Sequence, residues 1–253
     1  MGKNFEWTQR AEISLGALAT PATAGNESAV KNKSLSSSES MRAVAPAVRE
    51  ESLKLVQRLF LTPGQRPPKS VMFVGVDSGN ACSRLCGVIA EMLAENVAGS
   101  VCLVDGNFRA PVLADAYGVE NHHGLADSLR QEGPVRGFAT QVRAQGLWLV
   151  SSGSLEKDSL SLLNGGRMKQ RIGELKGEFE YVLVHVPALN VFEDALAFGQ
   201  LVDGAVLVVE ANATRREAAI RAAERLRQAG IMVLGAVLNN RTFAIPKALY
   251  ERV

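Results

Sequence analysis

Runs of apolar residues alternate with longer segments of mixed polarity from about residue 70 onward. The runs that have the length and the β-branched content of buried strands lie at residues 70–76, 100–105, 147–151, 181–186, 205–209 and 232–238. The segments between them are long enough for helices, and 85–95 has a clear helical pattern. Strands that are apolar throughout are typical of parallel sheets covered on both faces. The pattern therefore predicts an α/β fold with a doubly wound, mainly parallel sheet and helices on both faces.

The first part of the chain has a different character. Residues 1–47 are rich in Ser, Ala, Asn and Gly and show no sustained period, which predicts a flexible N-terminal tail. Residues 49–61 alternate apolar and charged positions as an amphipathic helix does, and Pro63 follows them. We therefore expect one folded domain over residues 48–253.

Charge, apolar run length and cysteine content indicate the expected partners and cellular location of the protein. The 28 basic and 26 acidic residues leave a net charge of +2, so no nucleic-acid partner is expected. No apolar run reaches about 18 residues, and the N-terminus lacks the basic-then-apolar order of a signal peptide. The sequence thus predicts a cytoplasmic location. An odd number of cysteines, Cys82, Cys86 and Cys102, predicts reduced thiols there.

A segment with the order of a nucleotide-binding loop follows the first apolar run. In sheets of this class ligands bind at the carboxyl ends of the strands, and residues 77–84 lie at such an end. A working loop needs glycine where the backbone approaches phosphate, a Lys for the β- and γ-phosphates, and a Ser or Thr for Mg²⁺. Here Ala81 and Cys82 occupy the Gly-Lys positions, while Gly79 and Ser83 remain.

Two further segments end on polar residues in the same way. They read LVDGNFRAPVL at 103–113 and LVHVPA at 183–188. Together with the loop, and with the Gly124-Leu125 segment and residues 237–241, they resemble the cytoplasmic domain of bacterial tyrosine kinases of the capsule and exopolysaccharide type. Those kinases are relatives of MinD/ParA ATPases. The resemblance extends over the whole domain and implies a P-loop NTPase-like fold.

The resemblance also implies which polar roles are changed. The phosphate-binding Lys of the family corresponds to Cys82, the second acid of the middle motif to Asn107, and the strand-end acid to His185. Because phosphoryl transfer relies on positioning and electrostatic stabilisation, loss of each charged group should cost several kcal/mol of transition-state stabilisation, roughly a factor of 10³. No catalytic residues are therefore expected.

What remains resembles a weak, vestigial nucleotide pocket. Its residues are Gly79, Ser83, Arg84, Asp105 and Asn239, the last at the position where the family's Asn reads the adenine base. Backbone donors and a helix N-terminus still favour anions there. We expect no resident cofactor, with weak binding of ATP or ADP as the remaining capacity.

Other interpretations of these residues stay open. Cys82 and Cys86 lie four apart and could bind a metal if the fold brought His122, His123 and His185 to them, although such cysteines are more often packing residues, and no metal is expected. Cys82 could instead be a thiolate of lowered pKa beside Lys69 or Arg84.

The polar groups at the strand ends also have alternative interpretations. His185 could occupy the position of the family's strand-end acid and make hydrogen bonds there. Asp105 could be an N-cap or a loop anchor instead of a metal-site acid, and Gly79 and Gly106 could serve tight turns only.

The helix before the first strand carries a further point of resemblance. The family motif E-x-x-R-x-x-R packs one subunit on the next, and it corresponds here to Glu51, Lys54 and Gln57. The resemblance implies a homo-oligomer through these residues, although Lys lacks the bidentate fork of Arg. An ordinary solvated helix face is the alternative.

The hypothesis is a catalytically degenerate kinase-like protein that regulates or scaffolds exopolysaccharide or capsule synthesis and export. It would dock on the cytoplasmic face of a membrane polysaccharide co-polymerase or chain-length regulator, and so lie peripherally at the inner membrane. One alternative is an active ATP-binding autokinase or ATPase that uses Lys69 or Arg84 as its cation and Tyr250 as phosphoacceptor. A MinD-like positioning factor would need a C-terminal amphipathic membrane helix, for which residues 244–253 are too short and mixed.

Overall fold

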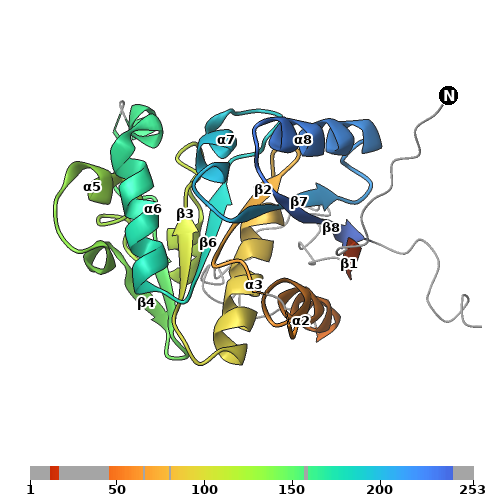
Figure 1. Ribbon diagram of the computed structural model, residues 1–253, viewed down its shortest axis with the longest axis horizontal. Coiled ribbons are helices and arrows are strands. Elements are labelled where there is room, and N and C mark those ends of the chain that lie inside the picture. Colours follow the sequence, from red (N-terminus) through yellow and green to blue (C-terminus); the bar gives the residue numbers. More distant parts are fainter. Residues whose placement is uncertain (1–11, 17–45, 65, 80, 157–158, 242–253) are drawn as a thin grey trace, which may run out of the picture.

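The computed structural model describes residues 12–16, 46–64, 66–79, 81–156 and 159–241 (Figure 1). Tyr250 and the C-terminal segment 244–253 lie outside the described residues, as does most of the predicted tail. The domain boundary at residue 48 therefore stays a prediction. No helix in the part of the chain that the structure describes combines the length and apolar character needed to cross a membrane.

The described strands form one eight-stranded sheet in the order β1-β8-β7-β2-β6-β3-β5-β4. They are β1 (Glu12–Gly16), β2 (Ser70–Gly75), β3 (Val101–Asp105), β4 (Thr140–Arg143), β5 (Leu147–Val150), β6 (Tyr181–Val186), β7 (Gly204–Glu210) and β8 (Val233–Arg241). Neighbouring strands are parallel except β4 and β5, which pair antiparallel. The predicted fold class, a mainly parallel sheet in an α/β domain, is confirmed.

Two edge strands were not predicted from the apolar pattern. Strand β1 lies inside the range predicted to be a flexible tail, and it pairs in parallel with β8, with Glu12 opposite Ala236. Strand β4 reads TQVR and leaves two of its four residues exposed. Edge strands depend mainly on main-chain hydrogen bonds to one neighbour, which leave little hydrophobic pattern in the sequence.

Helices cover both faces of the sheet (Figure 1). On one face lie α2 (Pro46–Phe60), α3 (Ala81–Asn96) and α4 (Leu113–Tyr117). On the other lie α5 (Leu125–Arg130), α6 (Gly166–Glu178), α7 (Asp194–Gly199) and α8 (Arg216–Gln228), with the 3₁₀ turns η1 (Val135–Phe138) and η2 (Ser159–Asn164). The arrangement matches the doubly wound prediction.

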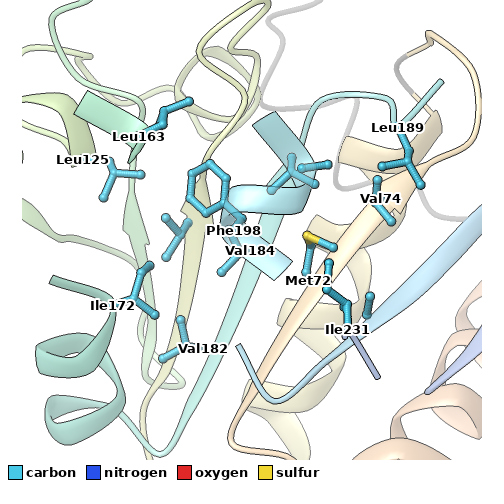
Figure 2. Packing of buried hydrophobic residues seen from close by; sticks show 14 of the residues in the cluster. Met72, Val74, Leu125, Leu163, Ile172, Val182, Val184, Leu189, Phe198 and Ile231 are labelled. Atoms are coloured by element: carbon cyan, nitrogen blue, oxygen red, sulfur yellow. The ribbon is translucent and has the colours of Figure 1, made fainter. Parts of the chain in front are cut away.

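Each face of the sheet has its own hydrophobic core. Val71 and Phe73 of β2 belong to the core beneath α2 and α3, while Met72 and Val74 belong to the core on the other face. Figure 2 shows Met72 and Val74 in the same hydrophobic cluster as Val184 of β6 and Phe198 of α7. Burying a side chain of this size contributes about 1.5–3 kcal/mol relative to exposure, so both faces stabilise β2.

The position of β2 in the strand order creates the site. The chain leaves β2 through α3 and returns as β3 beyond β6, whereas β7 lies on the opposite side of β2. Strand order thus reverses at β2, and ligands of open α/β sheets bind at such a switch point, outside the carboxyl ends of the strands. The ends of β2, β6, β7 and β3 meet there.

Candidate functional site

The loop after β2 turns back closely on the start of α3. A methyl carbon added to Gly75 would lie 3.2 Å from the carbonyl oxygen of Asp77 and 3.6 Å from Cβ of Cys82, so the backbone has little room here. The segment after β6 holds the loop from the side. Leu189 N–H donates to the carbonyl of Gly75 at 2.9 Å, and Asn190 Nδ2 donates to the Asp77 carboxylate at 3.3 Å. The loop is therefore tied to two strand ends.

Cys82 stands at the lysine position of this loop and is buried under it. Burial raises the pKa of the Cys82 thiol to about 12, although a backbone hydrogen bond from Gly75 acts in the opposite direction. The thiol is therefore neutral at pH 7. The alternative of a thiolate with lowered pKa beside Lys69 or Arg84 is wrong, because burial raises the pKa of this thiol.

Cys86 lies one turn further along α3 and is completely buried. Burial raises its pKa well above the ordinary value, and the nearby Cys82 and Asp105 add to the shift. Among the described residues no group of three or more His, Cys, Asp and Glu side chains is arranged to hold a metal ion. The two cysteines pack in the core beneath α3 instead.

Asp105 is the most completely bonded polar group at the site. Its Oδ2 accepts the N–H groups of Val112 at 3.1 Å and Leu113 at 3.0 Å, where α4 begins. Its Oδ1 accepts the N–H of Asn107 at 3.2 Å and faces Nδ1 of His185 at 3.2 Å. A carboxylate offers about four acceptor directions, and here each oxygen has two partners. The side chain is 1% exposed.

His185 reaches Asp105 from the neighbouring strand. The two residues are directly opposite each other in the register of β6 and β3, and His185 is also buried. The tautomer with its proton on Nδ1 donates to the carboxylate. His185 thus makes a hydrogen-bonding contact at the strand ends, which was one of the alternatives considered for it from the sequence.

Asn107 shapes the loop that follows β3. Its Oδ1 accepts the N–H groups of Arg109 at 3.2 Å and Ala110 at 3.1 Å, an arrangement in which the side chain mimics a backbone turn. The side chain therefore serves local backbone geometry. An uncharged amide suffices for that role.

Arg109 connects the same loop to α7. Its Nε donates to Asp194 Oδ2 at 2.8 Å and its Nη2 to Oδ1 at 3.3 Å, while the guanidinium lies 4.7 Å from the centre of the Phe192 ring. The hydrogen bond to Asp194 raises the pKa of Arg109 above its ordinary value. Arg109 lies in the segment 103–113 that carries the resemblance, but its partner Asp194 is 85 positions away and could not be found from the local sequence.

Asn239 lies at the end of β8, next to the start of α3. The residue is fully buried, and its Nδ2 donates to the carbonyl of Ala81 at 3.4 Å. Its Oδ1 has no hydrogen-bond partner among the described residues. The structure therefore brings Asn239 to the start of α3, with its donor group turned to the helix backbone, and its role in nucleotide binding stays a prediction. Ser83 is buried nearby, and Arg84 is half-buried on α3.

Glu210 was missed by the sequence analysis and lies at the mouth of the loop. Its Oε1 accepts Nδ2 of Asn240 at 2.9 Å. Its Oε2 would lie 3.7 Å from a methyl carbon built on Gly79. One feature of the sequence could have identified Glu210: it is an acidic residue directly after the apolar run of β7, and the carboxyl end of β7 lies at the same edge of the sheet as the loop.

The segment that resembles the family's Gly-Leu motif packs against the loop after β5. The Asp127 carboxylate accepts the N–H of Gly124 and that of Ser154, both at 2.9 Å. A Cβ at Gly124 would lie 2.4 Å from backbone atoms of Ser151 and Gly153. Glycine is needed here because two backbones approach closely.

The residues considered for oligomer contacts lie on α2. Lys54 Nζ lies 2.9 Å from Glu51 and 3.1 Å from Glu50, so its ion pairs are within its own helix. These hydrogen bonds raise the pKa of Lys54. Gln57 is exposed on the same helix. An oligomer through this face stays a prediction.

The chain is similar in sequence to bacterial proteins named tyrosine-protein kinases. No protein-family model matches the chain. The tyrosine-protein kinase YwqD of Bacillus subtilis is 27% identical over 176 residues, which is 70% of this chain and 74% of YwqD. The putative tyrosine-protein kinase CapB of Staphylococcus aureus is 25% identical over 172 residues, 68% of this chain and 75% of CapB.

Solved structures agree on the fold. The chimerical protein CapA2B2 superposes with a TM-score of 0.76 at 17% identity, covering 92% of this chain and 96% of the chimera. The kinase domain of Escherichia coli ETK gives 0.72 at 20% identity and 79% of each chain. MinD of Pyrococcus horikoshii, solved with Mg-ADP, gives 0.60 at 19%, covering 72% of this chain and 76% of MinD. The resemblance to bacterial tyrosine kinases and MinD/ParA proteins predicted from the motifs is confirmed.

Proposed function

We propose that this chain is a catalytically inactive relative of bacterial tyrosine kinases that works through its surfaces, as a regulatory or scaffolding component of exopolysaccharide or capsule synthesis and export. Its partner is the cytoplasmic face of a membrane polysaccharide co-polymerase or chain-length regulator. The protein then lies in the cytoplasm and reaches the inner membrane through that partner. Weak binding of ATP or ADP is the remaining nucleotide chemistry.

The bonding of Asp105 is the observation that carries this proposal. Both oxygens are saturated by three backbone N–H groups and His185, so the carboxylate has no free acceptor direction for Mg²⁺ or for a metal-bound water. Freeing one oxygen would break hydrogen bonds of a fully buried charge, each worth about 1.5–3 kcal/mol. The group is therefore a structural anchor for the loop before α4.

The remaining substitutions support the same conclusion. A neutral, buried Cys82 thiol supplies no positive charge to phosphates, and the amide of Asn107 supplies no negative charge to a metal. A Mg²⁺–triphosphate complex needs both kinds of charge close by. The side chains found here do not fit that group, and we assign no catalytic step to them.

The partner assignment rests on the resemblance and on the relatives that carry kinase names. The similarity to CapB and to the CapA2B2 chimera supports a place beside a membrane protein of polysaccharide export. A homo-oligomer through Glu51, Lys54 and Gln57 of α2 is part of the proposal. Loss of the second arginine weakens that contact, because Gln57 offers no charge.

Nucleotide chemistry is tested on the purified full chain. Isothermal titration with Mg·ATP and Mg·ADP, together with phosphate release and autophosphorylation, should show dissociation constants well above the micromolar range and no turnover. Micromolar affinity with turnover would refute the proposal and favour an autokinase that uses Lys69 or Arg84.

The role in the cell needs a separate experiment. A strain that lacks this chain should export polymer of altered length or amount, and the wild-type chain should restore it. A variant with Lys69→Ala and Arg84→Ala removes both candidate cations and should restore it equally. The Lys69 backbone bonds to Asp203 and Val182 do not involve the side chain, so the fold is kept. Failure of this variant to restore export, with a normal melting temperature, would favour the active enzyme.

A further inference from the structure

An acidic side chain, Glu210, lies beside the loop after β2, outside the motifs that carry the family resemblance. Glu210 ends β7, and the register of β7 with β2 places this end beside the loop, since Val208 pairs with Gly75. Its Oε2 is the nearest atom within 4 Å to a methyl carbon built on Gly79, at 3.7 Å. The carboxylate thus lies over the backbone that receives phosphate groups in related loops.

A hydrogen bond holds this carboxylate in place. Asn240 Nδ2 donates to Glu210 Oε1 at 2.9 Å, and Asn240 has a left-handed backbone with φ of 57°. Asparagine tolerates that conformation better than most residues, so the side chain can be aimed from the neighbouring strand β8. Thr214 Oγ1 also accepts the N–H of Glu210 at 3.2 Å and orders the end of β7.

Other side chains at the loop add negative charge, and Cys82 supplies no positive charge. Asp77 is an exposed acid within the loop, and Cys82 is neutral where the related kinases carry lysine. A phosphate at this backbone would meet one carboxylate within a few ångströms and a second on the loop itself. Two like charges about 5 Å apart repel noticeably even in a partly hydrated site.

We propose that Glu210, held by Asn240, weakens the binding of phosphate-containing ligands at this loop. The inference rests on the proposed function and deepens it, because the Glu210 carboxylate repels phosphate groups in addition to the effect of the missing charges. It predicts that neutralising one side chain opens the loop to anions without any change in Cys82, Asn107 or His185.

The test compares two neutralising variants of the full chain. Glu210→Gln keeps the shape and the hydrogen bond from Asn240 but removes the charge. Glu224→Gln makes the same change of net charge on the exposed side of α8 and is the matched control. The ligands are pyrophosphate, ADP without metal, and adenosine, titrated by calorimetry at low ionic strength.

Glu210→Gln should bind pyrophosphate and ADP about tenfold more tightly than wild type, as expected when one nearby like charge is removed. Adenosine binding should be unchanged, and the gain should shrink in high salt because screening weakens the repulsion it removes. Glu210→Asp, which keeps the charge, should behave as wild type. Melting temperatures verify that each variant folds.

An equal affinity for pyrophosphate in Glu210→Gln, Glu224→Gln and wild type would overturn the inference. So would the absence of measurable binding in Glu210→Gln at millimolar ligand. These outcomes leave the proposed function standing, whereas tight Mg·ATP binding with turnover by the wild-type chain would refute the function itself.

Discussion

Replacement of Asp105 by alanine separates a structural carboxylate from a functional one. An acidic residue that serves metal binding usually lowers the stability of the folded protein. Its replacement by alanine is therefore neutral or stabilising. Asp105 instead accepts three backbone N–H groups and pairs with His185, all in the interior. We therefore expect Asp105→Ala to destabilise the protein strongly.

The magnitude follows from the donors that lose their acceptor. A buried donor left without a partner costs about 1–3 kcal/mol. Four donors at the low end of that range give a loss of about 4 kcal/mol, because water can enter part of the space left by the carboxylate. At about 2–4 °C per kcal/mol for a domain of this size, the melting temperature should fall by roughly 8–16 °C.

Urea unfolding followed by circular dichroism measures this loss directly. Asp115→Ala is the control, since Asp115 is an exposed acid on α4, only two residues beyond Leu113. It should change the free energy of unfolding by less than about 0.5 kcal/mol, as surface substitutions generally do. A loss below about 1 kcal/mol in Asp105→Ala, or an equal loss in Asp115→Ala, would refute the structural assignment of Asp105.

Three more predictions follow from buried or crowded positions. The three cysteines are buried, with the pKa of Cys82 raised to about 12, so Ellman's reagent at pH 8 should react slowly with native protein and with all three thiols in urea; rapid native labelling would contradict this. Burial tends to raise the pKa of Asp203, but the ammonium of Lys176 and hydrogen bonds from Ser70 outweigh it, and the net pKa is lowered. The stability from Asp203 is therefore complete above the unfolded pKa near 4 and is lost as pH falls through the lower folded pKa, so Asp203→Asn should flatten the acid side of a plot of melting temperature against pH. Gly124→Ala forces a carbon to within 2.4 Å of backbone and should cost at least about 2 kcal/mol, whereas Gly137→Ala meets nothing within 4 Å and should be tolerated.

The apolar runs of the sequence predicted most of the sheet because burial on both faces leaves a local signal. Residues 181–186 form β6 as predicted, and the runs at 70–76 and 205–209 contain or lie within β2 and β7 to within one residue at each end. The predicted helix from Leu85 to Glu95 lies inside α3, which begins at Ala81 because the turn at Cys82 and Ser83 is also buried. Strands β1 and β4 escaped prediction since they are held by pairing at a sheet edge.

The sequence by itself determined the order of the buried strands along the chain and placed Cys82, Asn107 and His185 just after or at the ends of three of them. These are local facts, visible in the residue types and their spacing. Only the tertiary structure decided that His185 meets Asp105 across 80 positions and that Glu210 faces Gly79. The physical reason is that strand order and register bring these groups together, and neither is written in the local pattern of apolar and polar residues.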